Sequence, residues 1–407
     1  MTDPSIVLPF TETQRTAARR FVSYVFVDMA QLWLTHGWNA AGGHSIERLQ
    51  ADLTPAPLGY RRSMAVARQL FFFAQAWRVT GNAACAERAH ALYADLTGRF
   101  WDAEHGGWFF SLGDNGAGTG PGADPGKDLY GHAFAIFALS HYASVFRKAE
   151  AIDWARRTGE AVKRHLFLPQ GWFAQAARRD WSSPDPALEQ NPHMHLLEAW
   201  LALHAATGDA SVLRDAAQLV TLYTDRLHSA DGAKVLEHFD AAGRPQQERG
   251  QLVQPGHLYE WYWLLHDYAE SARRPEYKQI AAPLFDWANA RGVDPLHGGI
   301  YDQVDTDGQV VSDRKRIWPV TECIKVHAIR AAATADAGAH AALERWIAFM
   351  TTRYFTGGGG WHEFLRRDLQ PDSDYLPATT PYHVAMAALQ VAELFGGTTF
   401  LKPAAQP

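Results

Sequence analysis

The sequence has little cysteine. Only Cys85 and Cys323 occur in 407 residues. They lie far apart and fit no metal-binding spacing, so neither indicates a metal site. A chain with two isolated thiols is typical of a reducing compartment, and we expect a cytoplasmic protein.

Long apolar runs and basic runs are missing as well. No stretch of 18 uncharged apolar residues occurs, which argues against a membrane-spanning helix. Residues 1–10 lack the basic and apolar regions of a signal peptide, so we expect none. No run of basic residues is present, and the net charge of −6 with a pI near 6.3 argues against binding to nucleic acid or to an acidic membrane.

Aromatic residues and histidines are abundant. The chain has 15 Trp, 21 Phe and 19 His, and 47% of its residues are hydrophobic. This content is enough for a sizeable core. An aromatic load of this kind suits a large helical core, and it also suits walls on which sugars stack.

The clearest pattern is an internal repeat. Glycine turns at positions 43, 106, 171, 232, 298 and 358 are 63, 65, 61, 66 and 60 residues apart. Each unit consists of two helices followed by a glycine-aromatic hairpin. The expected helices span 12–35, 61–80, 83–100, 128–146, 148–165, 192–207, 209–227, 256–271, 275–291, 319–334, 338–354 and 380–396.

Six helical pairs of this regularity predict an all-α fold, an (α/α)6 barrel of twelve helices with short β-hairpins at one mouth. We expect residues 1–407 to form a single catalytic domain. An open solenoid is disfavoured because neither end of the chain resembles a polar capping repeat. The glycine-rich stretch 113–126 is expected to be a loop at the mouth, and it lacks the Gly-Lys-Ser/Thr of a phosphate cradle.

The helices that follow the hairpins share a pattern. Their first turns are polar and aromatic, and their bodies are apolar nearly all round, which is typical of buried helices. These six helices should form the inner ring, with their first turns converging at one mouth. The positive ends of their dipoles would favour a negative or electron-rich ligand there.

Titratable residues gather in these first turns. The candidates are His195, His257, Glu260, Glu322 and His383, with Arg68 slightly deeper. Imidazole titrates near ~6.5, so paired histidines suggest proton transfer at neutral pH. Glu260 and Glu322 could instead be the acid pair of a glycosidase, although the extra histidines would then have no role. A metal held by the three histidines is also left open.

Three neighbouring polar residues have simpler interpretations. His193 is two positions from His195, so we expect it to face away from the mouth. His132 could be a packing histidine, and Asn191 could cap its helix.

Several motifs together resemble one known family, the N-acylglucosamine 2-epimerase family. The resemblance covers nearly the whole chain, and the set of motifs is specific although no single member is. The motifs are Ala67-Arg68-Gln69, Gly106-Gly107-Trp108-Phe109, Tyr130-Gly131-His132, Asn191-Pro192-His193-Met194-His195, Pro255-Gly256-His257 with Glu260-Trp261, Trp318-Pro319 with Glu322, Gly360-Trp361 and Tyr382-His383.

The resemblance implies roles for these residues. It implies an (α/α)6 barrel that transfers a proton on an open-chain sugar without metal or cofactor. His257 and His383 would be catalytic, and Glu260 would orient His257 by accepting a hydrogen bond from its ring. The implied substrate-binding residues are Arg68, Tyr130, Asn191, His195, Arg249, Trp318, Glu322 and Trp361, with the two tryptophans walling the sugar.

Within the family, the likeness is greatest to the aldose–ketose isomerases. We expect interconversion of D-mannose and D-fructose through a cis-enediol, with D-lyxose and D-xylulose as a further pair. A 2-epimerase of the cellobiose or N-acylglucosamine type is the alternative. A sulfoquinovose isomerase is another, since rim arginines could bind a sulfonate (Arg178, Arg179, Arg314, Arg316). The expected partner is a monosaccharide, and the expected state is a monomer or homodimer.

Overall fold

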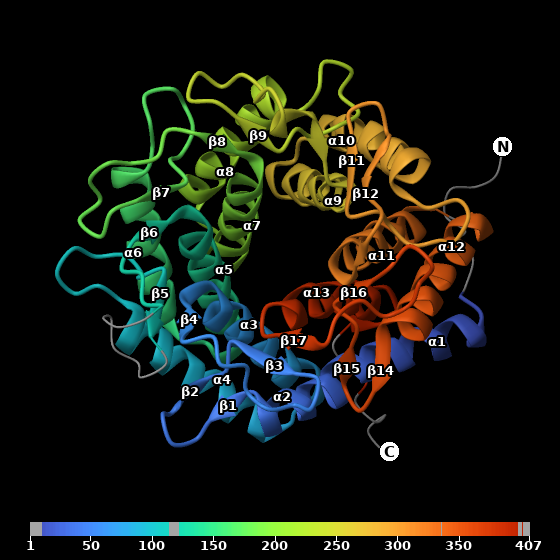
Figure 1. Ribbon diagram of the computed structural model, residues 1–407, viewed down its shortest axis with the longest axis horizontal. Helices are drawn as coiled ribbons and strands as arrows, with labels where there is room; N and C mark the ends of the chain where they lie inside the picture. The colour runs from blue at the N-terminus through green and yellow to red at the C-terminus, as the bar shows by residue number, and fades with distance from the viewer. Residues whose placement is uncertain (1–9, 114–121, 335, 398–400, 402–407) are drawn as a thin grey trace.

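The computed structural model describes residues 10–113, 122–334, 336–397 and 401, and these form a ring of helices (Figure 1). Six inner helices pack each on the next, and the last packs on the first. The expected (α/α)6 barrel is therefore confirmed. The inner helices are α3 (Ser63–Thr80), α5 (Leu129–Phe146), α7 (Gln190–Thr207), α9 (Pro255–Ala272), α11 (Ile317–Ala333) and α13 (Thr380–Leu394).

The outer helices cover this ring. The first is continuous through three segments, α1 (Glu12–Ser23), the π-helical turn η1 (Tyr24–Met29) and α2 (Ala30–His36). It packs against the last inner helix, so α1 and α13 lie side by side in the ring (Figure 1). The others are α4 (Ala83–Asp95), α6 (Ala149–His165), α8 (Ala210–Leu222), α10 (Glu276–Trp287) and α12 (Ala337–Phe349), of which four continue into π-helical turns, η2 (Leu96–Phe100), η3 (Tyr223–Leu227), η5 (Ala288–Gly292) and η6 (Met350–Tyr354).

Residue patterning separates the two rings. In α5 every residue from Gly131 to Ser140 is buried, as expected of a helix that is apolar nearly all round. In α6 the buried residues recur at helical spacing, at Ala151, Ala155 and Thr158, and charged residues lie between them. One face of α6 therefore packs inward, and the other meets solvent.

Short antiparallel strand pairs lie at the rim, at the N-terminal ends of the inner helices. The strand before each inner helix pairs with the strand after the next outer helix. The pairs are β4 (Tyr60–Arg62) with β5 (Ser111–Gly113), β6 (Lys127–Asp128) with β7 (Ala176–Ala177), β8 (Leu188–Glu189) with β9 (His238–Phe239), β10 (Leu252–Val253) with β11 (Gln303–Asp305), β13 (Lys315–Arg316) with β16 (Phe364–Leu365), and β17 (Tyr375–Pro377) with β3 (Arg48–Gln50).

The β17–β3 pair closes the ring, because it joins the last repeat to the first. The remaining strands are local: β1 (Trp38–Asn39) with β2 (His44–Ser45), β12 (Val310–Ser312) on β11, and β14 (Phe355–Gly357) with β15 (Gly360–Trp361). The expected hairpins at one mouth are thus confirmed. Residues 1–9 and 114–121, on which the signal-peptide and loop expectations depended, lie outside the described residues.

Two buried ion pairs hold the rim to the inner helices. The ammonium of Lys127 lies 3.0 Å from Asp102 Oδ2, and that of Lys315 lies 2.9 Å from Asp294 Oδ2. Each aspartate begins an Asp-x-x-His-Gly-Gly turn, at 102–107 and 294–299, and each lysine lies on the strand before an inner helix. Burial would raise the pKa of both aspartates, but the hydrogen bonds they receive lower it below the usual range.

Two histidines attach hairpins to inner helices. His193 accepts a hydrogen bond from the backbone of Phe173 (3.0 Å) at Nε2, and its Nδ1 donates to the carbonyl of Glu189 (2.6 Å). His132 makes the same pair of bonds, to Trp108 and Asp128 (3.0 and 2.7 Å). His193 therefore faces away from the site of His195, as expected. Burial lowers the pKa of His193 to about 4, so its ring is neutral in the fold.

We expect His193→Ala to make stability less sensitive to acid. In the wild type the unfolded imidazole (pKa ~6.5) binds a proton that the folded one refuses, so stability falls as pH drops from 7 toward 4. At pH 5 this residue should cost about 2 kcal/mol. The variant loses two buried hydrogen bonds, about 1–3 kcal/mol at pH 7.5. Urea unfolding measures the difference in the free energy of unfolding between wild type and variant, and this difference should be smaller at pH 5 than at pH 7.5. An equal difference at both pH values would contradict this account.

Two further observations concern the chain as a whole. Cys85 and Cys323 are both free and buried. Among the described residues, no helix combines the length and the apolar character needed to cross a membrane.

Candidate active site

Four polar residues of the inner helices lie at one depth of the barrel. Arg68, His195, Glu260 and Glu322 each lie five positions after the first residue of their helix (68 − 63, 195 − 190, 260 − 255 and 322 − 317). All four side chains are buried. Because equal steps along equivalent helices give equal depth, the repeat brings these side chains into one layer below the mouth.

His383 forms the first histidine–carboxylate pair. It lies on the first turn of α13, and its Nδ1 donates to Glu322 Oε1 at 3.0 Å. Burial lowers the pKa of His383 to about 3, against the opposing effect of Glu322, so the ring is neutral at pH 7. The bond at Nδ1 leaves the lone pair on Nε2, and this is the form that a general base requires.

The other oxygen of Glu322 is also engaged. The indole N–H of Trp263 donates to Oε2 (2.8 Å), and the ammonium of Lys325 lies 3.3 Å from it. Burial alone would raise the pKa of Glu322, but Lys325 and His383 outweigh it and lower the pKa to about 2. Glu322 is thus an ionised carboxylate behind His383. We had expected it among the substrate-binding residues.

His257 forms the second pair, with a residue that the sequence did not single out. Its Nδ1 lies 2.9 and 3.0 Å from the two oxygens of Glu237, in the segment that leads into β9. Gln190, the first residue of α7, donates to Glu237 (2.8 Å) and accepts from the indole of Trp261 (2.7 Å). Gln190 Nε2 also lies 2.8 Å from His257 Nδ1, so Glu237 and Gln190 together hold the ring.

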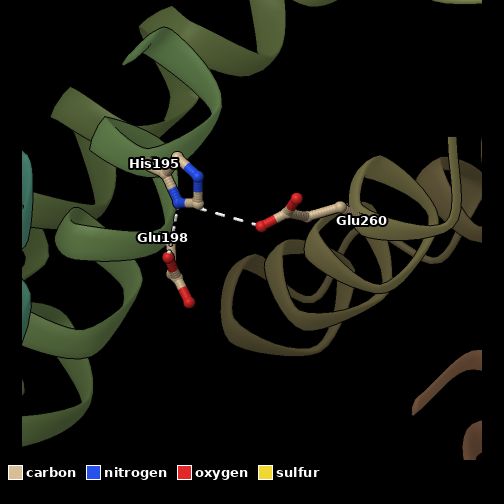
Figure 2. Close-up of side chains that lie close together, drawn as sticks. All are labelled: His195, Glu198 and Glu260. Carbon is tan, nitrogen blue, oxygen red and sulfur yellow. Dashed lines mark hydrogen bonds and ion pairs between the residues drawn. The ribbon is translucent and has the colours of Figure 1, made fainter. Parts of the chain in front are cut away.

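The expectation that Glu260 accepts a hydrogen bond from His257 is wrong. Neither carboxylate oxygen of Glu260 has a hydrogen-bond partner among the described residues. Helical side chains lean toward the N-terminus, so the ring of His257 on the first turn reaches the rim, and Glu260 lies one turn deeper. An ionisable neighbour is His195, whose Nδ1 lies 3.8 Å from Glu260 Oε1 (Figure 2).

Glu260 lies in a setting that favours its neutral form. Burial raises its pKa well above the ordinary value, and the nearby carboxylates of Glu322 and Glu198 raise it further. A protonated carboxyl group is both a donor and an acceptor. Glu260 is thus equipped to bind a hydroxyl group.

His195 and Arg68 lie beside Glu260. His195 Nδ1 bonds Glu198 Oε2 at 3.0 Å, on the same face of α7 (Figure 2). The guanidinium of Arg68 donates to the hydroxyl of Tyr130 (2.7 Å) and lies over the ring of Phe134 (4.0 Å). Burial, and then Arg68, lower the pKa of His195 well below its usual value. The neutral imidazole and the cation are both suited to polarise a carbonyl oxygen.

The two candidate tryptophans lie in different places. Trp318 lies between the paired histidines, with ring centroids 5.0 Å from His257 and 5.7 Å from His383. The indole of Trp361 donates to Glu363 (3.0 Å), and its ring packs near Trp33 of α2. These contacts tie Trp361 to the outer ring, whereas Trp318 lies at the catalytic candidates.

The last two candidates lie nearer the rim. Asn191, the second residue of α7, makes no cap: the helix begins after Glu189 without a side-chain cap, and the buried Oδ1 of Asn191 has no partner among the described residues. That oxygen is free to accept from a ligand. Arg249 is exposed on the 3-10 turn η4 (Arg249–Gln251) and contacts His238 Nε2 at 3.1 Å.

Two overlapping groups could hold a metal ion. They are His195, Glu198 and Glu260, and Glu260, Glu322 and His383; within each, the ligand atoms lie within 4.8 Å of one another. His257 belongs to neither, so the group of three histidines considered from the sequence is not assembled. The expectation of metal-free chemistry stays a prediction.

Replacing Glu237 by Gln tests the His257 pair. We expect kcat to fall about 10²-fold with little change in KM, because an amide no longer fixes the tautomer and aim of His257. Steady-state rates at pH 7.5 measure this effect. Glu189→Gln is the matched control, because this carboxylate pairs with the rim residue His238 (3.4 Å). This variant should leave kcat unchanged. Equal losses in both variants would refute the assignment.

The chain is similar to known proteins over most of its length. The solved structure of cellobiose 2-epimerase from Spirochaeta thermophila superposes with a TM-score of 0.84 at 23% identity, over 95% of this chain and 98% of that one. "Mannose-6-phosphate isomerase" of Rhizobium meliloti is 31% identical over 383 residues, 89% of this chain and 93% of the relative. "D-mannose isomerase" of Pseudomonas cannabina pv. alisalensis is 29% identical over 354 residues, 80% and 82% of the two chains.

The protein is therefore an isomerase-type enzyme of the (α/α)6-barrel class that acts on sugars. Residues 43–387 match the model of the N-acylglucosamine 2-epimerase (GlcNAc 2-epimerase) family. The chain belongs to that family.

Proposed function

We propose that the enzyme is an aldose–ketose isomerase that interconverts D-mannose and D-fructose by metal-free proton transfer. The observation that carries the proposal is the pair of histidines, His257 and His383, each held by a carboxylate at Nδ1 and each close to the ring of Trp318. An imidazole held this way offers Nε2 to substrate, as proton transfer next to a carbonyl requires. The names of the two relatives given above support a mannose-type substrate.

The proposed reaction is an isomerisation, so the sugar gains and loses no atoms or electrons overall. In the open-chain aldose, Nε2 of His383 removes the proton from C2, and the electron pair forms the C1–C2 double bond as the carbonyl oxygen becomes an enediolate. Arg68 and His195 stabilise that oxygen, because fixed donors act strongly in a buried site. The imidazolium then returns the proton to C1, and the C2 oxygen becomes the carbonyl. His257 would carry the hydroxyl proton from O2 to O1, and Glu260 would bind another hydroxyl group.

A 2-epimerase is the second candidate. It is favoured by the presence of two equivalent histidine–carboxylate pairs, since epimerisation needs a base on one face of C2 and an acid on the other. Anionic sugars are less favoured. Two of the rim arginines are already paired with carboxylates, Arg179 with Asp102 (2.9 Å) and Arg314 with Asp372 (2.6 Å).

A product panel separates these functions. The enzyme would be incubated in D2O with mannose, mannose 6-phosphate, cellobiose and sulfoquinovose, and products identified by proton NMR. We expect fructose from mannose, with solvent deuterium at C1 and no loss of rate in EDTA. Glucose as the first product would indicate the epimerase, and loss of all activity on chelation would overturn the metal-free mechanism.

A further inference from the structure

Lys325 is a buried cation next to the His383 pair. It lies on α11 three residues after Glu322, so both side chains share a helix face. Its side chain is 3% exposed. The ammonium lies 3.3 Å from Glu322 Oε2 and 3.2 Å from the ring centroid of Trp263, and it makes no hydrogen bond among the described residues. The ammonium therefore contacts both an aromatic ring and a carboxylate. Burying a charge costs free energy unless the charge compensates another one.

The surroundings show which charges it compensates. Its field lowers the pKa of Glu198, Glu260 and Glu322, each of which burial alone would raise. These three carboxyl groups come from α7, α9 and α11. The titratable and charged groups that the neighbouring elements contribute are Arg68 and Arg78 (α3), His141 (α5), His195 and Glu198 (α7), Glu260, His266, Asp267 and Glu270 (α9), Lys278 (α10), Glu322 (α11), and His383 and Glu393 (α13).

A cavity reaches Lys325 from the other end of the barrel. Its volume is about 710 Å³, and it lies between the C-terminal halves of the inner helices, opposite the histidines. Lys325 and Glu198 line it, and so do the exposed residues Ala205 and Ala332, which place it at the surface. The ammonium thus contacts the His383 pair on one side and a solvent-accessible space on the other.

We propose that Lys325 is a positioning residue that keeps Glu322 ionised and thereby holds His383 with its proton on Nδ1. The inference rests on the proposed function of His383 as the base. If Glu322 took up a proton, its O–H would donate to Nδ1, the ring proton would move to Nε2, and the base would lose its lone pair. Lys325 prevents this without touching the sugar.

Substitution at Lys325 tests the charge. Lys325→Met keeps the side-chain length and removes the ammonium. We expect kcat to fall about 10²-fold with little change in KM, and the acidic limb of the pH–rate profile to move to higher pH. Lys325→Arg keeps the charge, and the cavity has room for the larger group, so activity should return to within about 10-fold of wild type. Lys278→Met, at a second lysine of the same cavity that pairs with Glu270, is the control and should be silent.

Chemical rescue gives a readout that a merely structural role would not produce. Lys325→Ala should regain at least ~10-fold of its lost rate in methylammonium or ethylammonium, which enter through the far cavity, with saturation. Ethanol, which has similar size and no charge, should not rescue. Equal effects of amine and alcohol would overturn the proposal.

Imidazole ¹⁵N NMR separates this inference from the proposed function. It reports the tautomer of His383 whether or not a substrate is known. The wild type should show a proton on Nδ1, and Lys325→Met should show it on Nε2. An unchanged tautomer refutes the role of Lys325, whereas a shifted tautomer in an enzyme that converts none of the sugars leaves Lys325 assigned and refutes the function.

Discussion

Replacing His383 by Gln is expected to lower kcat for sugar conversion by about 10²–10⁴-fold, the usual contribution of a general acid–base group. The amide has about the size of the ring but cannot take up a proton. Its hydrogen bond to Glu322 can persist, so the network behind it should survive. In D2O, exchange of the C2 proton should fall in parallel, because removal of that proton is the step assigned to His383. Proton NMR spectra of samples quenched at successive times measure both the conversion rate and the exchange rate.

His141→Gln is the matched control for this variant. His141 is also on an inner helix, and burial lowers its pKa to about 3, as for His383. It lines the far cavity and makes no contact with the paired histidines. Its replacement should leave kcat within about 2-fold of wild type, a bound set by the absence of any proton-transfer role. If His383→Gln retained near-full activity, His383 would not be the base.

Replacing Lys315 by Met is expected to reduce the free energy of unfolding by about 3–5 kcal/mol, the cost of removing one partner of a buried ion pair. Lys315 and Asp294 are both 0% exposed. The ammonium also donates hydrogen bonds to the carbonyls of Gly298 (2.6 Å) and Arg367 (2.8 Å). The substitution therefore removes contacts that join the strand of Lys315 to two other segments of the rim. Chemical denaturation at pH 7.5 measures the loss. Activity per folded molecule should persist, since this anchor lies outside the histidine pairs.

Two further variants test whether the loss of stability comes from the buried Lys315–Asp294 pair. Lys163→Met breaks a half-exposed pair with Asp215 (3.0 Å) and should cost only about 0–1 kcal/mol. The double variant Lys315→Met/Asp294→Asn should lose less than the sum of the single changes, because the buried carboxylate that lost its lysine is then neutralised as well. Strict additivity would show that the pair is not coupled.

The repeat made most of the fold predictable. Evenly spaced glycine turns and six apolar helices dictate the ring, because such helices can bury their faces only against one another. The layer of Arg68, His195, Glu260 and Glu322 follows from the same periodicity. Two partners could also have been found by spacing, since Glu198 and Lys325 each lie three residues after a candidate.

The partner of His257 could not be predicted in this way. Glu237 lies in an irregular segment before β9, where no helical period relates it to α9. Its approach depends on the β8–β9 pairing and on Gln190, which are tertiary features. The sequence offered Glu260 because it is three residues from His257. Depth within the barrel, not spacing along the helix, decided which carboxylate reached the ring.

The β17–β3 pairing has a consequence for how the protein is made. Leu376 pairs with Leu49, so the ring cannot close until residues 375–377 have left the ribosome. His383 follows this strand directly, on the last helix. During synthesis the apolar surfaces of the inner helices therefore stay exposed until the ring closes, and in that state they can aggregate or bind chaperones. A chain that has not yet been made as far as residue 383 therefore lacks the histidine of the His383–Glu322 pair.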